Sequence, residues 1–229
     1  VAARQCGVDV CGTTLLGYPA FEHTWALILS LMKQIPLEND AMHRGGWQVS
    51  FADGLRGKTL GVLGLGKLGA EVAKIGLAFQ MEVIAWSENL TAARARDCGV
   101  QWVSKNDLLS SSDVLTIHLV LSARTRGLIG TEELQLMKSS AYLVNTSRGP
   151  IVDETALIDA LTRKSIRGAA LDVYDTEPLP SDHPIRKLDN AVLTGHTGYV
   201  IRDNFVHGYG EVVEDVLAWL VGKPLRLLN

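Results

Sequence analysis

One stretch of the chain, from Lys58 to Phe79, constrains the fold more than any other. Residues 59–63 form a short apolar run, residues 64–69 read Gly-Leu-Gly-Lys-Leu-Gly, and residues 70–79 repeat apolar positions at helical spacing. A strand, a glycine turn and a helix in this order form the corner at which a parallel sheet binds a dinucleotide pyrophosphate. A ligand-free glycine turn is the alternative for the six-residue motif alone, and the flanking strand and helix patterns disfavour it.

Each glycine of this turn has a physical reason to be there. Gly64 permits the tight turn, Gly66 lets backbone N–H groups approach an anion, and Gly69 lets the helix lie close to the strand. The positive end of the helix faces the same anion. The candidate cofactor contacts of this turn are Gly64, Gly66, Lys67, Leu68 and Gly69.

Strand and helix patterns alternate from Lys58 onward, which is typical of a parallel sheet covered on both faces. The predicted strands are Thr59–Leu63, Met81–Trp86, Val100–Val103, Asp113–Leu119, Ala141–Asn145, Ala169–Val173 and Ala191–Thr194. The predicted helices are Ala20–Gly46 with a bend at Pro36, Ala70–Phe79, Thr91–Cys98, Lys105–Ser110, Thr131–Met137 with Thr131 as N-cap, Asp153–Lys164 and Asn204–Val221. The predicted fold class is α/β, a doubly wound parallel sheet of the Rossmann type.

The first predicted helix carries an apolar stripe formed by Trp25, Ile28, Leu29 and Met32. Ordinary core packing is the favoured interpretation of this stripe. Contact with a second subunit is the alternative, because the helix is unusually apolar.

Composition narrows the classes of function. The 229 residues are 47% hydrophobic with a formal charge of −3, which gives no electrostatic footprint for nucleic acid or an anionic membrane. No apolar run is long enough to span a bilayer, and no stretch resembles a signal peptide.

Three cysteines without a C-x-x-C pair predict reduced thiols in the cytoplasm. His23, His43, His183 and His207 show no metal-ligand spacing, so no metal site is predicted.

Three reactive side chains follow predicted strands. Arg148 comes after the strand ending at Asn145, Glu177 after the strand ending at Val173, and His196 after the last strand. Ligands bind beyond the carboxyl ends of the strands in an open parallel sheet. The sequence therefore predicts a cation, a carboxylate and an imidazole on the same edge as the glycine turn.

These three groups suit hydride transfer between a nicotinamide cofactor and a 2-keto acid. An arginine holds a carboxylate through two hydrogen bonds, and a histidine exchanges a proton with the carbonyl oxygen. A carboxylate on the other ring nitrogen orients the imidazole. Taken singly, Arg148 also fits a surface ion pair and Glu177 a solvated turn. The joint placement, with His196 between glycine-rich neighbours, carries the prediction.

Further strand ends supply candidate cofactor contacts, namely Ser87, His118, Thr146 and Asp172. His118 either lines the cofactor cleft or only packs, and packing is favoured. Asp172 and Asp175 flank a tight turn, which favours a structural role over a catalytic one. Ser147 lacks the G-x-S-x-G pattern of a hydrolase.

Four stretches of the sequence resemble the D-isomer-specific 2-hydroxyacid dehydrogenases, in family order. They are GKTLGVLGLGKLGAEVAKIGLAF, NTSRGPIVDETAL, GAALDVYDTEPLP and the surroundings of His196. The resemblance runs from about residue 10 to the C-terminus. It implies that Arg148 binds the substrate carboxylate and polarises the keto group, that His196 is the acid/base, and that Glu177 is its partner.

The resemblance also implies a domain order. Residues 1–22 would end an incomplete substrate-binding domain, residues 23–199 would form the NAD(P)-binding domain with its linking helix, and residues 200–229 would return to the substrate domain. Members of the family are usually homodimers, with the helix from Ala20 near the contact. Most of the first half of the substrate domain is absent from this sequence, so slow turnover is one expectation.

Two positions depart from the family pattern. Gly195 stands where the family usually has a proline before the histidine. Ser87 stands where NAD-specific members carry an acidic residue on the adenosine ribose, with Glu88 one position later and Arg94 as a candidate phosphate partner. The sequence leaves NAD and NADP open and favours NAD.

The predicted function is therefore the reversible reduction of a small 2-keto acid to its D-2-hydroxy acid by NAD(P)H. The alternative is a catalytically weak or inactive dinucleotide-binding regulatory module of the same family. Formate oxidation is disfavoured, because formate dehydrogenases of this family carry glutamine at the position of Glu177, whereas phosphite oxidation stays open.

Overall fold

The computed structural model describes residues 2–229, and the chain divides into two compact units. Residues Ala20–Gly198 form one unit, here called the sheet unit. The chain up to Pro19 together with Tyr199–Asn229 forms the other, here called the terminal unit. The assignment of the chain ends to a substrate-binding domain stays a prediction.

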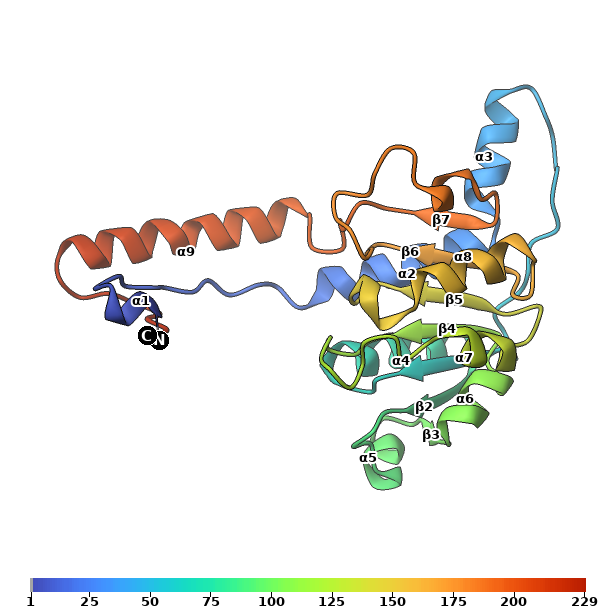
Figure 1. Ribbon diagram of the computed structural model, residues 1–229, viewed down its shortest axis with the longest axis horizontal. Coiled ribbons are helices and arrows are strands. Elements are labelled where there is room, and N and C mark those ends of the chain that lie inside the picture. Colours follow the sequence, from blue (N-terminus) through green and yellow to red (C-terminus); the bar gives the residue numbers. More distant parts are fainter. Residues whose placement is uncertain (1) are drawn as a thin grey trace. The chain divides into compact units, whose positions relative to one another are not determined.

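The sheet unit is built on a seven-stranded sheet in the order β3-β2-β1-β4-β5-β6-β7, and every neighbouring pair is parallel (Figure 1). The strands are β1 (Thr59–Leu63), β2 (Glu82–Trp86), β3 (Gln101–Trp102), β4 (Val114–Ile117), β5 (Tyr142–Asn145), β6 (Gly168–Leu171) and β7 (Ala191–Leu193). Because all strands are parallel, all their carboxyl ends lie on one edge of the sheet. The direction in which successive strands are added to the sheet reverses between β1 and β4. This topology is the predicted doubly wound fold.

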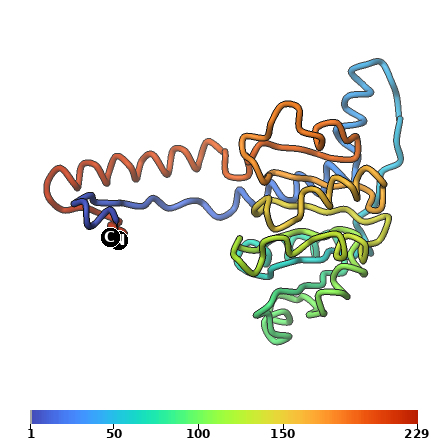
Figure 2. Tube along the Cα trace, in the orientation of Figure 1, coloured from blue at the N-terminus to red at the C-terminus, as the bar shows by residue number. Residues whose placement is uncertain are grey.

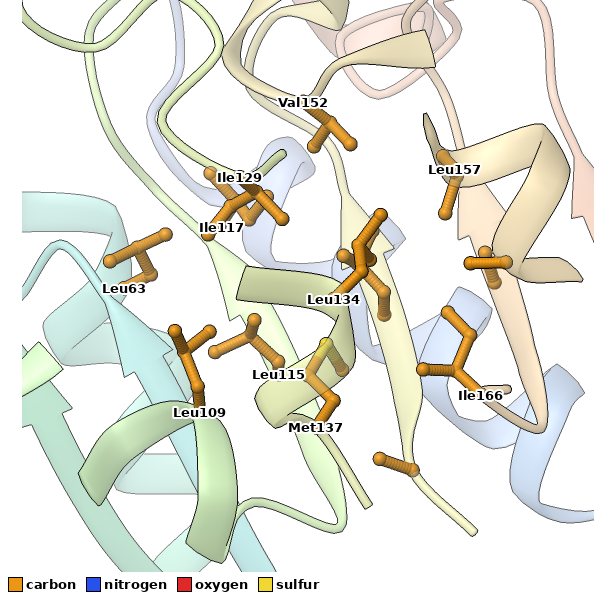
Figure 3. Packing of buried hydrophobic residues seen from close by; sticks show 14 of the residues in the cluster. Leu63, Leu109, Leu115, Ile117, Ile129, Leu134, Met137, Val152, Leu157 and Ile166 are labelled. Carbon is orange, nitrogen blue, oxygen red and sulfur yellow. The ribbon is translucent and has the colours of Figure 1, made fainter. Parts of the chain in front are cut away.

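Helices cover both faces of this sheet (Figure 1). The helices of the sheet unit are α2 (Tyr18–Met32, within the unit from Ala20), α3 (Ile35–His43), α4 (Lys67–Ala78), α5 (Ala92–Asp97), α6 (Lys105–Ser111), α7 (Thr131–Leu136) and α8 (Glu154–Thr162). Side chains of α6, α7 and α8, among them Leu109, Leu134 and Leu157, belong to the same buried cluster as Leu115 of β4 on one face of the sheet (Figure 3). Residues of α2, α4 and α5 pack on the other face. Two buried layers thus hold the strand ends in place.

The apolar stripe of α2 belongs to the second of these layers. Trp25, Ile28 and Met32 are 4%, 0% and 2% exposed and belong to the buried core cluster, and Leu29 packs against it. The core interpretation of the stripe is therefore confirmed. A second subunit would have to use other residues.

Local differences from the predicted elements have physical causes. The long helix predicted from Ala20 breaks at Gln34, which adopts a left-handed φ of 53°, two residues before the expected bend at Pro36. The N-cap of α7 is Gly130 rather than Thr131, because Glu133 accepts the Gly130 amide at 3.1 Å. The short helices α1 (Ala2–Gln5), η1 (Gly149–Ile151) and η2 (Pro184–Lys187) lack a periodicity that would predict them.

The terminal unit pairs the two ends of the chain around α9 (Arg202–Leu220) (Figure 2). Cys11 bridges Leu227 in antiparallel fashion, and Arg226 forms ion pairs with three carboxylates of α9. The apolar residues of α9 are exposed; they include Val213, Val216, Leu217 and Leu220. Within residues 2–229, no helix has the length and apolarity to cross a membrane.

Candidate functional site

The strand register aligns the predicted site residues. Leu63, Trp86, Ile117, Asn145, Leu171 and Leu193 form one row across β1, β2 and β4–β7. The residues that follow this row are Gly64, Ser87, His118, Thr146, Asp172 and Thr194. Five of these six were predicted as cofactor contacts from sequence. One edge of the sheet therefore presents them side by side.

The glycine turn has the geometry of a close backbone approach. Gly64 has a φ of +105°, and a Cβ there would lie 2.6 Å from the His118 carbonyl oxygen. A Cβ on Gly69 would collide with the Gly64 carbonyl, so the start of α4 lies tightly against the turn. A Cβ on Gly66, by contrast, would project into open space. The turn therefore excludes side chains at two positions for packing and leaves the third open for a ligand.

A pocket of about 440 Å³ opens beside this turn. It is lined by Gly64 and Gly66, by the end of β2 from Trp86 to Asn89, and by parts of segment 118–128. The N-terminus of α4 begins at Lys67, directly after Gly66. An open pocket, a bare glycine backbone and a helix N-terminus are what a dinucleotide pyrophosphate needs. The residues present therefore fit NAD.

Not every predicted cofactor contact lines this pocket. Lys67 is exposed and Leu68 half-buried in the first turn of α4, while Gly69 is buried against Gly64. Thr146 lies 2.9 Å from Thr24 of α2 through the two hydroxyl oxygens. The roles of Lys67, Leu68, Thr146 and Asp172 toward a cofactor stay predictions.

His118 lines the pocket, so packing alone does not describe it. Its Nε2 lies 2.9 Å from Thr116 Oγ1. Burial lowers the pKa of His118 to about 4, because the charged imidazolium loses its hydration. His118 therefore lines the pocket as an uncharged imidazole at physiological pH.

Glu177 and His196 are in direct contact. Nδ1 of His196 lies 2.6 Å from Oε2 of Glu177, and the amide of Tyr174 donates to Oε1 at 2.9 Å. Burial opposes the ionisation of Glu177, but hydrogen bonds from His196 and Tyr174 outweigh it and hold the pKa of Glu177 below its usual value. The carboxylate therefore stays charged beside the imidazole and fixes which nitrogen carries a proton.

The backbone around His196 is unusual. His196 has a φ of 55°, in the left-handed region that few non-glycine residues occupy. Its amide donates to the Asp172 carbonyl oxygen at 2.7 Å. Residues in such strained conformations gather at functional sites. A pocket of about 480 Å³ opens beside the pair, and Arg186, Leu179 and Leu193 also line it.

Arg148 lies on the loop next to this pair. A Cβ on Gly149 would collide with the backbone of Tyr174, so the loop after β5 lies against the segment that leads to Glu177. Asn145 Nδ2 donates to the Arg148 carbonyl oxygen at 3.0 Å and holds the loop. The Arg148 side chain is exposed, and in residues 2–229 it makes no hydrogen bond or ion pair with Glu177 or His196. The structure thus joins Glu177 to His196 and places Arg148 on the adjoining loop.

One group of polar residues at this edge was not predicted from sequence. His23 of α2 reaches the ends of β6 and β7, with its Nε2 3.0 Å from Thr194 Oγ1 and 3.3 Å from Asp172 Oδ1. No local sequence signal links His23 to residues 149 and more positions away, because the contact depends on how α2 crosses the sheet. No group of three metal-ligating side chains occurs within the described chain.

Known proteins share the sequence and architecture of this chain. Residues 25–198 match the model of the D-isomer specific 2-hydroxyacid dehydrogenase NAD-binding domain. A glyoxylate reductase of Aeropyrum pernix is 40% identical over 238 residues, which cover 99% of this chain and 71% of that protein. A D-3-phosphoglycerate dehydrogenase of Archaeoglobus fulgidus is 40% identical over 98% of this chain, but the match spans 43% of that protein.

A solved structure gives the same result. The D-lactate dehydrogenase of Aquifex aeolicus, crystallised with NAD and lactic acid, superimposes with a TM-score of 0.83 at 30% identity, covering 97% of this chain and 72% of that one. The matched family model covers well over half of the chain and includes the glycine turn, Arg148, Glu177 and His196. This chain therefore belongs to the D-isomer-specific 2-hydroxyacid dehydrogenases and contains the NAD-binding domain of that family.

Proposed function

We propose that this protein reversibly reduces a small 2-keto acid to its D-2-hydroxy acid, with NADH as hydride donor. The single observation that carries the proposal is the 2.6 Å contact between His196 and Glu177 on the sheet edge that also bears the glycine turn. The relatives named above act on small hydroxy or keto acids by their names, and this supports the substrate class.

Bound NADH supplies the hydride in this proposal. The residues of the chain bind the substrate and move the proton. Arg148 carries a permanent charge on an exposed side chain, and its planar guanidinium suits the substrate carboxylate. His196 is bonded to Glu177 through Nδ1, which leaves Nε2 to donate a proton to the carbonyl oxygen. In the reverse direction Nε2 removes the hydroxyl proton.

Glu177 keeps the ring of His196 in one orientation through its contact with Nδ1. Its own negative charge is secured by the two hydrogen bonds that lower its pKa. Neutralising Glu177 would therefore impair proton transfer more than substrate binding.

The test is NADH oxidation with glyoxylate, hydroxypyruvate and bulkier keto acids, together with phosphite oxidation by NAD. We expect turnover with a keto acid, a loss of at least about a hundredfold in kcat for His196→Ala, and a smaller loss for Glu177→Gln. NADH binding, measured by fluorescence, should be the same in all three proteins. Turnover that survives His196→Ala would refute the assigned role.

A dinucleotide-binding regulatory module is the second candidate, because the pocket beside the glycine turn is lined by residues of the sheet unit alone. Tight NADH binding without turnover of any tested acid would favour it. The complete set of Arg148, Glu177 and His196 supports the enzyme, since a sensor of dinucleotide needs no proton donor beside the cofactor.

We also propose a homodimer in the cytosol, where the three free cysteines would stay reduced. Because the stripe of α2 is buried, we place the contact of the sheet unit on α3 and on the loop of residues 44–52 that follows it. Trp47 and Phe51 are 73% and 97% exposed, and Glu38 holds the loop between them by accepting from the Ser50 amide at 2.7 Å. Exposed aromatic residues on an ordered loop are typical of interfaces. Light scattering should show a dimer for the native chain and a monomer for Phe51→Glu.

A further inference from the structure

We propose that His23 is a positioning residue for His196, acting through Thr194 and Asp172. The inference rests on the proposed dehydrogenase function, because His196 is the proton donor there. His23 itself makes no contact with His196 among the described hydrogen bonds and ion pairs. Its influence passes through the loop 194–198, which carries His196.

The hydrogen-bond directions around Thr194 assign the proton of His23. The Thr194 hydroxyl has one hydrogen and lies 2.6 Å from Asp172 Oδ1, to which it donates. Its oxygen must then accept from His23 Nε2, 3.0 Å away. The same Nε2 lies 3.3 Å from Asp172 Oδ1. His23 therefore carries a proton on Nε2 and shares it between the hydroxyl and the carboxylate.

Asp172 in turn holds the loop on both sides of His196. Its carboxylate accepts from Thr194 Oγ1 before His196, and from the amides of Thr197 and Gly198 after it, at 2.8 and 2.9 Å. Its carbonyl oxygen accepts the His196 amide. The left-handed conformation of His196 persists because these bonds over-determine the loop. Asp172 is 2% exposed, so little water is available to replace a lost partner.

Loss of His23 would leave the buried Asp172 carboxylate with one donor fewer and the Thr194 oxygen without the donor from which it accepts. Removing a hydrogen-bond donor from a buried charged acceptor is costly, so the carboxylate or Thr194 would shift toward the donors that remain. Either shift moves the loop that aims the imidazole at Glu177. A misplacement of about 1 Å at a reacting group costs up to about a hundredfold in rate, although the substrate still binds.

His23 and Gly198 lie close to the two points at which the chain passes from one unit to the other. The chain passes between its two units after Pro19 and after Gly198. His23 follows the first passage by four residues, and Gly198 is the last residue before the second. Both are bound to the Asp172 carboxylate. The same carboxylate therefore binds residues near both ends of the sheet unit.

The test compares His23→Leu, which removes the donor, with His23→Gln, which places an amide N–H near the same point. We expect His23→Leu to lower kcat about tenfold while KM for NADH stays within about threefold of the native value, and His23→Gln to restore most of kcat. Thr194→Val, which removes the bridging hydroxyl and leaves α2 intact, should reproduce the loss. It also keeps the inference testable should His23→Leu fail to fold.

His183 provides a matched control. It forms a pair with Glu154 at 3.3 Å, equal in distance to the pair of His23 with Asp172, and its side chain is similarly buried. His183→Leu should leave kcat unchanged. An equal fall in kcat for His183→Leu and His23→Leu would show a general structural effect and overturn the inference.

A spectroscopic readout separates this inference from the proposed function. The proton on His196 Nδ1, held 2.6 Å from Glu177, should give a low-field NMR signal in histidine-labelled protein, assigned by its absence in His196→Ala. We expect the signal to be lost or shifted in His23→Leu and retained in His23→Gln and His183→Leu. An unchanged signal in His23→Leu would contradict the positioning role, whether or not the native chain turns over a keto acid.

Discussion

At the scale of single residues, two carboxylates on the same sheet edge have different surroundings. Asp172 is almost fully buried and accepts bonds from Thr194, Thr197 and Gly198, whereas about a third of the Glu177 side chain is exposed. Both pKa values lie below the usual range because hydrogen bonds outweigh the cost of burial. Asp172 is therefore suited to hold structure, and Glu177 to face a reaction.

The first prediction concerns acid stability. Burial raises the pKa of Asp172, but bonds from His23, Thr194, Thr197 and Gly198 lower it further, to about 2 against the usual 3.8. A depressed pKa contributes stability above pH 4, and this contribution is lost as the pH falls through 2. Its size is about 2 kcal/mol. Asp172→Asn should therefore be less stable than the native chain in urea at pH 7, with a gap that narrows toward pH 2. A gap independent of pH would contradict this.

The second prediction concerns cofactor choice. Glu88 lines the dinucleotide pocket at the end of β2, where a 2′-phosphate would bring further negative charge. Arg124 lines the same pocket. Once the Glu88 carboxylate is neutralised, the positive charge of Arg124 would attract the 2′-phosphate without an opposing negative charge. Glu88→Gln should raise kcat/KM for NADPH about tenfold and leave that for NADH within about threefold. Glu82→Gln, at the start of the same strand, is the control and should leave the ratio unchanged. If the ratio of kcat/KM for NADPH to kcat/KM for NADH were the same in Glu88→Gln and Glu82→Gln, Glu88 would not determine the choice of cofactor.

At the scale of elements, the turn between β1 and α4 separates two demands on glycine. Gly69 is required by packing, since a Cβ would meet the Gly64 carbonyl. Gly66 has open space beside it and is required only by a ligand. The sequence pattern shows both glycines but does not distinguish the reasons for them.

The third prediction uses that difference. Gly69→Ala should lower the free energy of unfolding by about 1–3 kcal/mol, because the helix must move away from the turn. Gly66→Ala should leave stability within about 0.5 kcal/mol of native but weaken NADH binding at least about tenfold. Thermal unfolding and fluorescence titration measure the two effects. Equal NADH affinity in Gly66→Ala and the native chain would mean that the pyrophosphate does not bind at this turn.

At the scale of the whole molecule, the dinucleotide pocket and the His196 pair lie within the sheet unit alone. The exposed apolar residues of α9 belong to the terminal unit. Binding of cofactor therefore depends on one unit.

The fourth prediction follows from this division. A fragment of residues 20–198 should unfold in one cooperative transition and bind NADH with a Kd within about threefold of the whole chain. Calorimetry and fluorescence titration would measure this. Loss of NADH binding in a folded fragment would show that the terminal unit contributes to the pocket.

Much of this architecture could be predicted from local patterns. The apolar run of residues 59–63 became β1 with the same bounds, and Ala191–Thr194 became β7 with one residue fewer. Hydrophobic periodicity depends on residues a few positions apart, so it predicts individual helices and strands well. The break at Gln34 was missed because the left-handed conformation of that residue has no propensity signal.

Local sequence patterns predict the alternation of strands and helices and the glycine turn, because each depends on residues within a few positions. The adjacency of β5, β6 and β7 and the contacts of Glu177 with His196 and of His23 with Asp172 arise from the tertiary structure. These contacts join residues 19 and 149 positions apart. They depend on strand order and on the path of α2, which side-chain periodicity does not encode.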